Sequence, residues 1–184
     1  KANPHGVDVG PLQPSLPDRL FTEDKRIHLE PEMVTADLGR VRATFFGQRE
    51  GAGTGDLLLI GRRDLRSNIS WMHNSQRLVR GKTRCTVIMH PQDAAGRGLA
   101  DGQLVQVESR VGCITLPLAV SDEVMPGVVC IPHGWGHGRP GVGLRVASRH
   151  PGASYNDVSD ADLLDELTGN AALNGVPVRV ASAL

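Results

Sequence analysis

Short apolar runs separated by turn residues recur along the chain from residue 57 onward. Runs of four or five apolar residues bounded by glycine or proline are typical of strands buried on both faces. The pattern predicts such strands at Leu57–Ile60, Cys85–Met89 and Val128–Ile131. Over Leu104–Val120 apolar and polar residues alternate on either side of a turn at Arg110–Gly112, which predicts a hairpin.

Two short helices and a last strand complete the predicted elements. Pro91 suits the first turn of a helix that stops near Gly98. Ser159, followed by acidic residues and three leucines, predicts a capped helix that ends at Gly169. Val176–Val180 predicts a closing strand. About six short strands with two small helices favour a closed, barrel-like sheet.

The first 55 residues contain several prolines and few apolar clusters, and we expect a connector there rather than a folded domain. Gly51–Gly55 is similar to a phosphate-binding glycine loop, but it precedes a strand instead of following one, which argues against a dinucleotide-binding fold of the Rossmann type. The predicted organisation is therefore a connector over 1–55 and one domain over 56–184.

Composition agrees with a β-rich or α+β fold, since 22 glycines and 12 prolines accompany only 3% aromatic residues. No apolar run approaches the roughly 18 residues of a membrane-spanning helix, so we expect a soluble chain outside the membrane, with a cytoplasmic location. Cys85, Cys113 and Cys130 each lie in an apolar run, and we interpret them as reduced core residues. Thiolates at close spacing are absent, so an iron–sulfur cluster or a structural zinc would have to be bound elsewhere.

The formal net charge is zero, but basic residues are concentrated in one stretch with a single acid, Asp64. They are Arg62, Arg63, Arg66, Arg77, Arg80, Lys82 and Arg84. Such a stretch is typical of an anion-binding segment and equally of a solvated basic face. Few aromatic residues accompany it, so we do not expect nucleic acid as a partner.

Three segments combine residue types that suit a phosphorylated, nitrogen-rich ligand. The first, Gly61–Asn74, follows a predicted strand and offers guanidinium groups for phosphate and amides for a heterocycle. The second, His133–His137, is glycine-rich and carries a tryptophan. The third contains Asn156, whose amide both donates and accepts. Each has a structural alternative: a polar loop, a tight turn and a turn before a helix, respectively.

Together these segments resemble the molybdopterin-dinucleotide-binding domain that ends the dimethyl sulfoxide reductase superfamily, which includes formate dehydrogenases and several nitrate reductases. The resemblance covers roughly Leu57 to Val180 and rests on an ordered series of short motifs. They are Gly61-Arg62-Arg63, Asn68-x-x-Trp71-x-His73-Asn74, Met89–Ala94, Gly98–Gly102, Pro126–Val129, Pro132–Trp135, Asn156 and Asp165-x-x-Thr168-Gly169-Asn170.

The resemblance implies a double-psi β-barrel that binds molybdopterin guanine dinucleotide as part of a larger molybdenum or tungsten oxidoreductase. It implies no catalytic residue and no metal ligand in this chain, and it makes the catalytic domains of the same polypeptide the expected partner. The residues given a cofactor-binding role by the resemblance are Gly61, Arg62, Arg63, Asn68, Trp71, His73, His133, Gly134, Trp135 and Asn156.

Two other functions fit the same residues. A double-psi barrel can also be a noncatalytic module that recognises a protein or a nucleic acid, and the fold alone does not separate the two. Clustering of the three candidate segments in one pocket would favour the cofactor. A small metal-dependent hydrolase using His133 and His137 is a third possibility, although two ligands without a third make a weak metal site.

Overall fold

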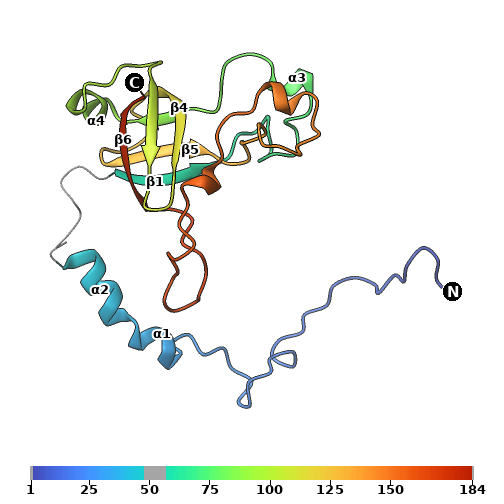
Figure 1. Ribbon diagram of the computed structural model, residues 1–184. Coiled ribbons are helices and arrows are strands. Elements are labelled where there is room, and N and C mark those ends of the chain that lie inside the picture. Colours follow the sequence, from blue (N-terminus) through green and yellow to red (C-terminus); the bar gives the residue numbers. More distant parts are fainter. Residues whose placement is uncertain (1, 48–56, 184) are drawn as a thin grey trace. The chain divides into compact units, whose positions relative to one another are not determined.

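The computed structural model describes residues 2–47 and 57–183, which belong to two compact units, Lys1–Gln48 and Arg49–Leu184. The second unit is a closed six-stranded barrel, visible as the group of arrows in Figure 1. The glycine-rich segment Gly51–Gly55 and the predicted boundary at residue 55 lie outside the described residues. The assignment of the first unit as a connector therefore stays a prediction.

The barrel contains the strands in the order β1-β5-β2-β4-β3-β6, in which β1 pairs with β5 and β2 with β4 in parallel, while the other pairs are antiparallel. The strands are β1 Leu57–Arg62, β2 Val87–Met89, β3 Leu104–Glu108, β4 Cys113–Val120, β5 Val128–Pro132 and β6 Val176–Ser182. The short helices of this unit are α3 Gln76–Val79, α4 Pro91–Gly96, η1 Ala147–Arg149 and η2 Tyr155–Asp157. This arrangement confirms the expected β-rich fold with short helices.

In most strands every second residue fills the barrel interior, whereas in β5 all residues from Val129 to Pro132 are buried. Leu57 and Leu59 of β1 are fully buried, whereas Leu58 and Ile60, which alternate with them, are partly exposed. Alternation follows because successive side chains of a strand point to opposite faces, and only one face of a barrel strand is interior. The sequence therefore predicted these strands correctly, but it overestimated burial on both faces for β1, while β5 is buried on both faces as expected.

The hairpin predicted over Leu104–Val120 is confirmed as β3 and β4. Their inward residues are Val105, Val107, Ile114, Leu116 and Leu118, all buried. Cys113 stands at the outer face of β4 and is exposed, while Cys85 and Cys130 are buried. The expectation of a core position was thus wrong for Cys113, because its place in the alternation directs it outward.

The helix predicted between Ser159 and Gly169 does not form. Asp160, expected to favour the helix N-terminus, instead accepts two hydrogen bonds from Arg110 at 2.6 Å each. Further on, Asp165 accepts from both the amide and the hydroxyl of Thr168, and an isolated bridge joins Leu164 to Ala171. Side-chain bonds of this kind offer the backbone a turn in place of a helix, and a helix of this length is marginal without packing.

Two helices lie in the first unit, which was expected to be a connector. They are α1 Glu32–Ala36 and α2 Leu38–Phe46. None of the described residues 2–47 is buried. No helix within the described ranges is long and apolar enough to cross a membrane.

Candidate functional site

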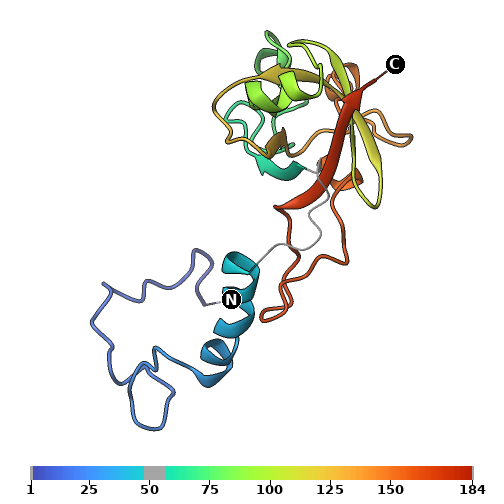
Figure 2. The same ribbon diagram turned by 90° about the vertical axis from the view of Figure 1, so that its left-hand side faces the viewer.

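Two long loops leave the same end of the barrel, because they follow strands that run in parallel. Arg62, the last residue of β1, lies opposite Pro132, the last residue of β5, and the His133 amide continues the pairing by donating to the Arg62 carbonyl at 3.0 Å. The loop Arg63–Cys85 follows β1 and leads through Thr86 into β2. The loop beginning at His133 follows β5. Figure 1 and Figure 2 show the two loops side by side beyond the strand ends, and Asn74 joins them by accepting from the amides of Val146 and Ala147.

The His133 imidazole lies directly over the backbone of Gly61. A Cβ at residue 61 would be 1.9 Å from His133 Nε2, so only glycine allows this contact. The same imidazole packs against the ring of Tyr155 at a centroid distance of 4.2 Å. Tyr155 is buried and donates its hydroxyl hydrogen bond to the Leu173 carbonyl, so it fixes the position of the His133 ring.

His73 occupies the centre of the second contact between the loops. It is 1% exposed, and its Nδ1 is 2.5 Å from His137 Nε2. Its ring also packs on Trp135 at 4.2 Å between centroids. His73 Nε2 and Trp135 Nε1 are buried without a hydrogen-bond partner among the described residues. Buried polar atoms are rarely left unpaired, so these two make the cluster a candidate site for a ligand.

Close backbone approach explains the glycine at residue 134. Its φ is +86°, and a Cβ there would lie 2.2 Å from the carbonyl carbon of Ile69. The facing loop turns at Asn68 and Ile69, which have φ values of 45° and 63°. A left-handed backbone is unusual for a β-branched residue such as Ile69, and such conformations cluster at functional sites.

Burial sets the protonation of the aromatic cluster. Desolvation, reinforced by the neighbouring His137, lowers the pKa of His73 to about 4. Burial also lowers the pKa of His133, with a further contribution from the positive charge of Arg63, and burial lowers the pKa of His137. The buried hydroxyl of Tyr155 has its pKa raised to about 12. At neutral pH the cluster is therefore uncharged and suits a polar, uncharged heterocycle.

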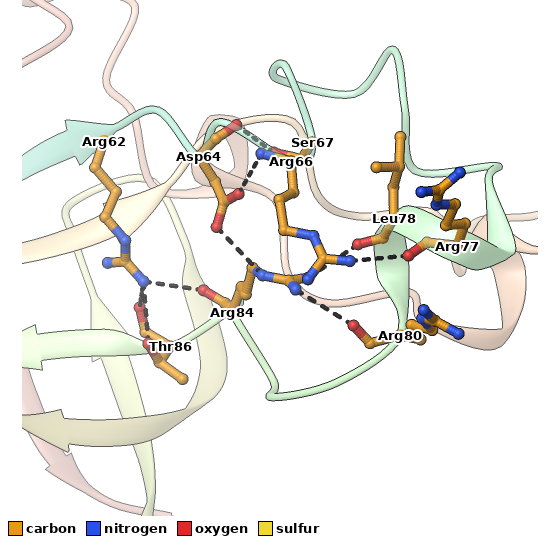
Figure 3. A network of polar contacts seen from close by, with 9 residues as sticks. All are labelled: Arg62, Asp64, Arg66, Ser67, Arg77, Leu78, Arg80, Arg84 and Thr86. Atoms are coloured by element: carbon orange, nitrogen blue, oxygen red, sulfur yellow. Dashed lines mark hydrogen bonds and ion pairs between the residues drawn. The ribbon is translucent and has the colours of Figure 1, made fainter.

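The two neighbouring arginines of the Gly61-Arg62-Arg63 motif have different environments. Figure 3 shows the Arg62 guanidinium directed toward Arg84 and Thr86, where it donates to backbone carbonyls. Arg63 is exposed and has no hydrogen-bond partner within the described part of the chain. Arg63 is thus the one of the two whose guanidinium is available to pair with a phosphate.

The ten residues predicted for the site are not all in one cluster. Gly61, His73, His133, Gly134 and Trp135 come together through the contacts above. Asn68 stands at the edge of the cluster in the turn that faces Gly134.

Trp71 and Asn156 are exposed. Trp71 is 84% exposed and makes no ring contact among the described residues. Asn156 follows Tyr155 in η2, and its side chain is exposed. Trp135 borders a depression of about 390 Å³ that Lys82, Thr83, His150 and Gly152 also line.

Three residues of the site were not predicted to take part in cofactor binding. Tyr155 packs against the His133 imidazole, His137 contacts the buried imidazole of His73, and the Asn174 side chain accepts from the Gly61 amide at 2.8 Å. Asn174 is separated from Gly61 by 113 residues, and no local pattern marks it. His137 lies in the predicted segment His133–His137, although it was not among the ten residues given a cofactor-binding role.

No group of three or more His, Cys, Asp or Glu side chains suited to a metal ion occurs in residues 2–47 and 57–183. His133 and His137, considered above as metal ligands, have separate partners in Tyr155 and His73.

Comparison with known proteins identifies the class of domain. The family described as "Molydopterin dinucleotide binding domain" matches residues 57–177. The chain is 30% identical over 124 residues to the molybdopterin-containing subunit ArrA of the arsenate respiratory reductase of Chrysiogenes arsenatis, covering 63% of this chain and 14% of that protein. It is 46% identical over 56 residues to the dimethyl sulfoxide/trimethylamine N-oxide reductase of Rhodobacter capsulatus, covering 30% of this chain and 7% of that protein.

Among solved structures, acetylene hydratase from Pelobacter acetylenicus superimposes with a TM-score of 0.59 and 22% identity, over 86% of this chain and 21% of that one. The chain belongs to the molybdopterin-dinucleotide-binding domain family, and its barrel is the expected double-psi β-barrel. It spans less than a quarter of the length of each of these relatives.

Proposed function

We propose that the chain binds molybdopterin guanine dinucleotide as the C-terminal domain of a larger molybdenum or tungsten oxidoreductase. The observation that carries the proposal is the aromatic cluster, in which His73 Nε2 and Trp135 Nε1 are buried without partners in the described part of the chain, beside Gly61 and Gly134, where a Cβ would clash. A pterin presents ring nitrogens and a carbonyl that pair with such atoms. When bound, the cofactor supplies two-electron redox chemistry at its metal.

The polar residues around the cluster match the other parts of this ligand. The exposed guanidinium of Arg63 suits the pyrophosphate, because a planar fork pairs bidentately with phosphate oxygens. The amides of Asn68 and Asn156 suit a guanine edge, since an amide both donates and accepts. His133 is uncharged, and its ring packs against Tyr155. Its role is to form a hydrogen bond with the pterin ring.

The expected partner is the set of catalytic domains of the same polypeptide. Support comes from the relatives, of which this chain spans only a small part, and from the apolar surface of the first unit, where Leu38, Phe45 and Phe46 are all more than half exposed. Exposed apolar clusters of this kind mark contact surfaces. Two further expectations from the sequence stay predictions: that the enzyme is of the formate dehydrogenase or nitrate reductase type, and that it is cytoplasmic.

The test is made on the full-length polypeptide, purified as the wild type and as the double variant Arg63→Ala/Asn156→Ala. The cofactor is released, identified by mass spectrometry and quantified beside molybdenum and tungsten. We expect a guanine dinucleotide form of molybdopterin in the wild type and at least about tenfold less in the double variant, since two ligand hydrogen bonds are lost. The matched control, Arg145→Ala, removes an exposed arginine outside the site.

A wild-type protein that contains no pterin would overturn the proposal and favour a barrel that recognises a protein or nucleic acid. A wild type and a double variant with equal pterin content would remove Arg63 and Asn156 from the site. Formate and nitrate, offered to the metal-containing wild type, separate the two expected enzyme types.

A further inference from the structure

The Arg62 side chain joins three segments of the barrel end. Its Nη1 donates to the Cys130 carbonyl at 2.7 Å, and its Nη2 lies 2.9 Å from the Arg84 carbonyl and 3.0 Å from both the carbonyl and the hydroxyl of Thr86. The backbone carbonyl of Arg62 also accepts from His133. One residue therefore connects the end of β1, the end of β5 and the approach to β2, as Figure 3 shows for Arg84 and Thr86.

The strand pairing explains why a side chain is needed at this place. β2 and β5 pair antiparallel with Ile88 opposite Cys130. Extending this register would place Thr86 opposite Pro132, which has no N–H to donate. The guanidinium of Arg62 supplies N–H donors where the backbone of β5 has none.

Other arginines of the basic stretch hold the loop Arg63–Cys85 together internally. Arg84 donates to the carbonyls of Leu78 and Arg80, and its Nε lies 3.7 Å from Asp64 Oδ2. Arg66 donates to the Arg77 carbonyl. Figure 3 shows these contacts as one continuous network with that of Arg62. Much of the basic stretch is therefore used for backbone carbonyls and not for an external anion.

We propose that Arg62 is a positioning residue, whose guanidinium latches the loop Arg63–Cys85 to the barrel and so fixes His73 for the site. The consequence for the cofactor rests on the function proposed above. The latch itself, defined by Arg62 and its acceptors on Cys130, Arg84 and Thr86, does not depend on any ligand. Arg63 differs from it, because it is exposed and has no such acceptor among the described residues.

The cysteines of the chain provide the test. Cys85 lies between Arg84 and Thr86, whose carbonyls accept from Arg62, and is 3% exposed, with its thiol also in contact with the backbone of Ala153. We expect loss of the latch to expose this thiol. Cys130 lies within β5, so its thiol is exposed only when the barrel itself opens. Cys113 is exposed, so it should react with a thiol reagent in every variant and serves as the control for the activity of the reagent.

The 184-residue chain is treated with N-ethylmaleimide, and the modification of each cysteine is followed by peptide mass spectrometry. We expect Cys85 to react at least about tenfold faster in Arg62→Ala than in the wild type, with a smaller change at Cys130, because the loop opens locally. The matched control Arg63→Ala removes the same charge at the next residue and leaves Cys85 protected. Arg62→Lys gives an intermediate rate, since an ammonium group cannot span the separate acceptors as a fork does.

Cys85 reacting equally slowly in Arg62→Ala and Arg63→Ala would overturn the proposal. Equal acceleration of Cys85 and Cys130 would also overturn it, because the residue would then support the whole barrel and not the loop. If Arg62→Ala does not fold, Arg62→Lys decides: faster modification of Cys85 alone supports the latch, and a rate equal to that of the wild type refutes it.

The cofactor consequence is measured separately in the full-length polypeptide. Arg62→Ala is expected to lose both Cys85 protection and bound pterin, whereas Arg63→Ala loses pterin alone. A full-length protein without pterin in any variant would end the proposed function and leave the thiol result intact. Pterin content unchanged in an Arg62→Ala protein with reactive Cys85 would show that the latch does not position the site.

Discussion

The two units of the chain differ in how far they bury a leucine side chain, as Leu59 of β1 and Leu38 of α2 show. Leu59 is fully buried in the barrel, whereas Leu38 is 61% exposed. The barrel buries its apolar residues because β1 pairs with strands from the middle and the end of the sequence. The first unit has two short helices, and none of its described residues is buried.

The contrast teaches that an apolar pattern alone does not produce a core. A helix of nine residues such as α2 is marginal in water without an apolar partner, while each barrel strand receives two neighbours from the topology. We therefore expect substitutions in the barrel to change the stability of this chain and matched substitutions in the first unit to leave it nearly unchanged.

The largest difference in unfolding free energy between a barrel substitution and its counterpart in the first unit is expected for the two leucines. Leu59→Ala should lower the free energy of unfolding by about 2–5 kcal/mol, because it removes a fully buried side chain and leaves a cavity. Leu38→Ala should change it by less than about 0.5 kcal/mol, since its side chain is already solvated. Urea denaturation followed by tryptophan fluorescence measures both, because Trp71 and Trp135 lie in the barrel unit. Equal effects would contradict the contrast.

A smaller difference is expected for two histidines, His73 in the barrel loop and His28 in the first unit. Burial holds the pKa of His73 at about 4, below the usual value near 6.5 of an unfolded chain. Between these values the unfolded state binds a proton that the folded state does not, so stability falls as the pH falls from 6.5 to 4. The loss reaches about 3 kcal/mol for the full interval.

The variant His73→Gln should reduce the dependence of unfolding free energy on pH between 7 and 4, and the remaining slope is expected from His133 and His137, whose pKa values burial also lowers. His28→Gln is the control, because the His28 imidazole is largely exposed, and its replacement should leave the slope in place. A slope in His73→Gln as steep as that of the wild type would show that His73 does not contribute to it. Denaturation curves at intervals of about half a pH unit across this range measure the slope.

Strand positions could be predicted from the sequence because they depend on local patterns. The apolar runs at Leu57–Ile60 and Val128–Ile131 and the alternation over Leu104–Val120 each produced a strand. The helix at Ser159–Gly169 was predicted wrongly, because Asp160 is bound by Arg110, a residue 50 positions earlier. Nothing local to residues 159–169 indicates that partner.

The site could be predicted only as a set of segments, not as contacts. Gly61 and Gly134 were predicted to approach a cofactor, which stays a prediction, and the structure shows instead that His133 and Ile69 of the chain itself lie against them. The separation of Arg62 from Arg63 could not be predicted, since two adjacent arginines look alike until the acceptors of one are known. The roles of all ten residues in binding a cofactor stay predictions.

The smallest effects on stability are expected for substitutions of two glycines, Gly61 of β1 and Gly39 of α2. A Cβ at residue 61 would lie 1.9 Å from His133 Nε2, so Gly61→Ala must displace an imidazole that Tyr155 and the barrel end hold in place. We expect a loss of about 1–3 kcal/mol of unfolding free energy, as for overpacking. A Cβ at residue 39 would meet nothing within 4 Å, and Gly39→Ala should favour α2 by up to about 1 kcal/mol, seen as added helicity in far-ultraviolet circular dichroism.

The glycine pair also tests whether His133 is as firmly placed as the barrel core. If Gly61→Ala loses no stability, the imidazole has moved aside without resistance, and the loop after β5 behaves like the exposed first unit. If the loss matches that of a core substitution, the Gly61–His133 contact belongs energetically to the barrel. The second outcome agrees with an arrangement in which Tyr155 and Asn174 fix the two sides of the contact before any ligand arrives.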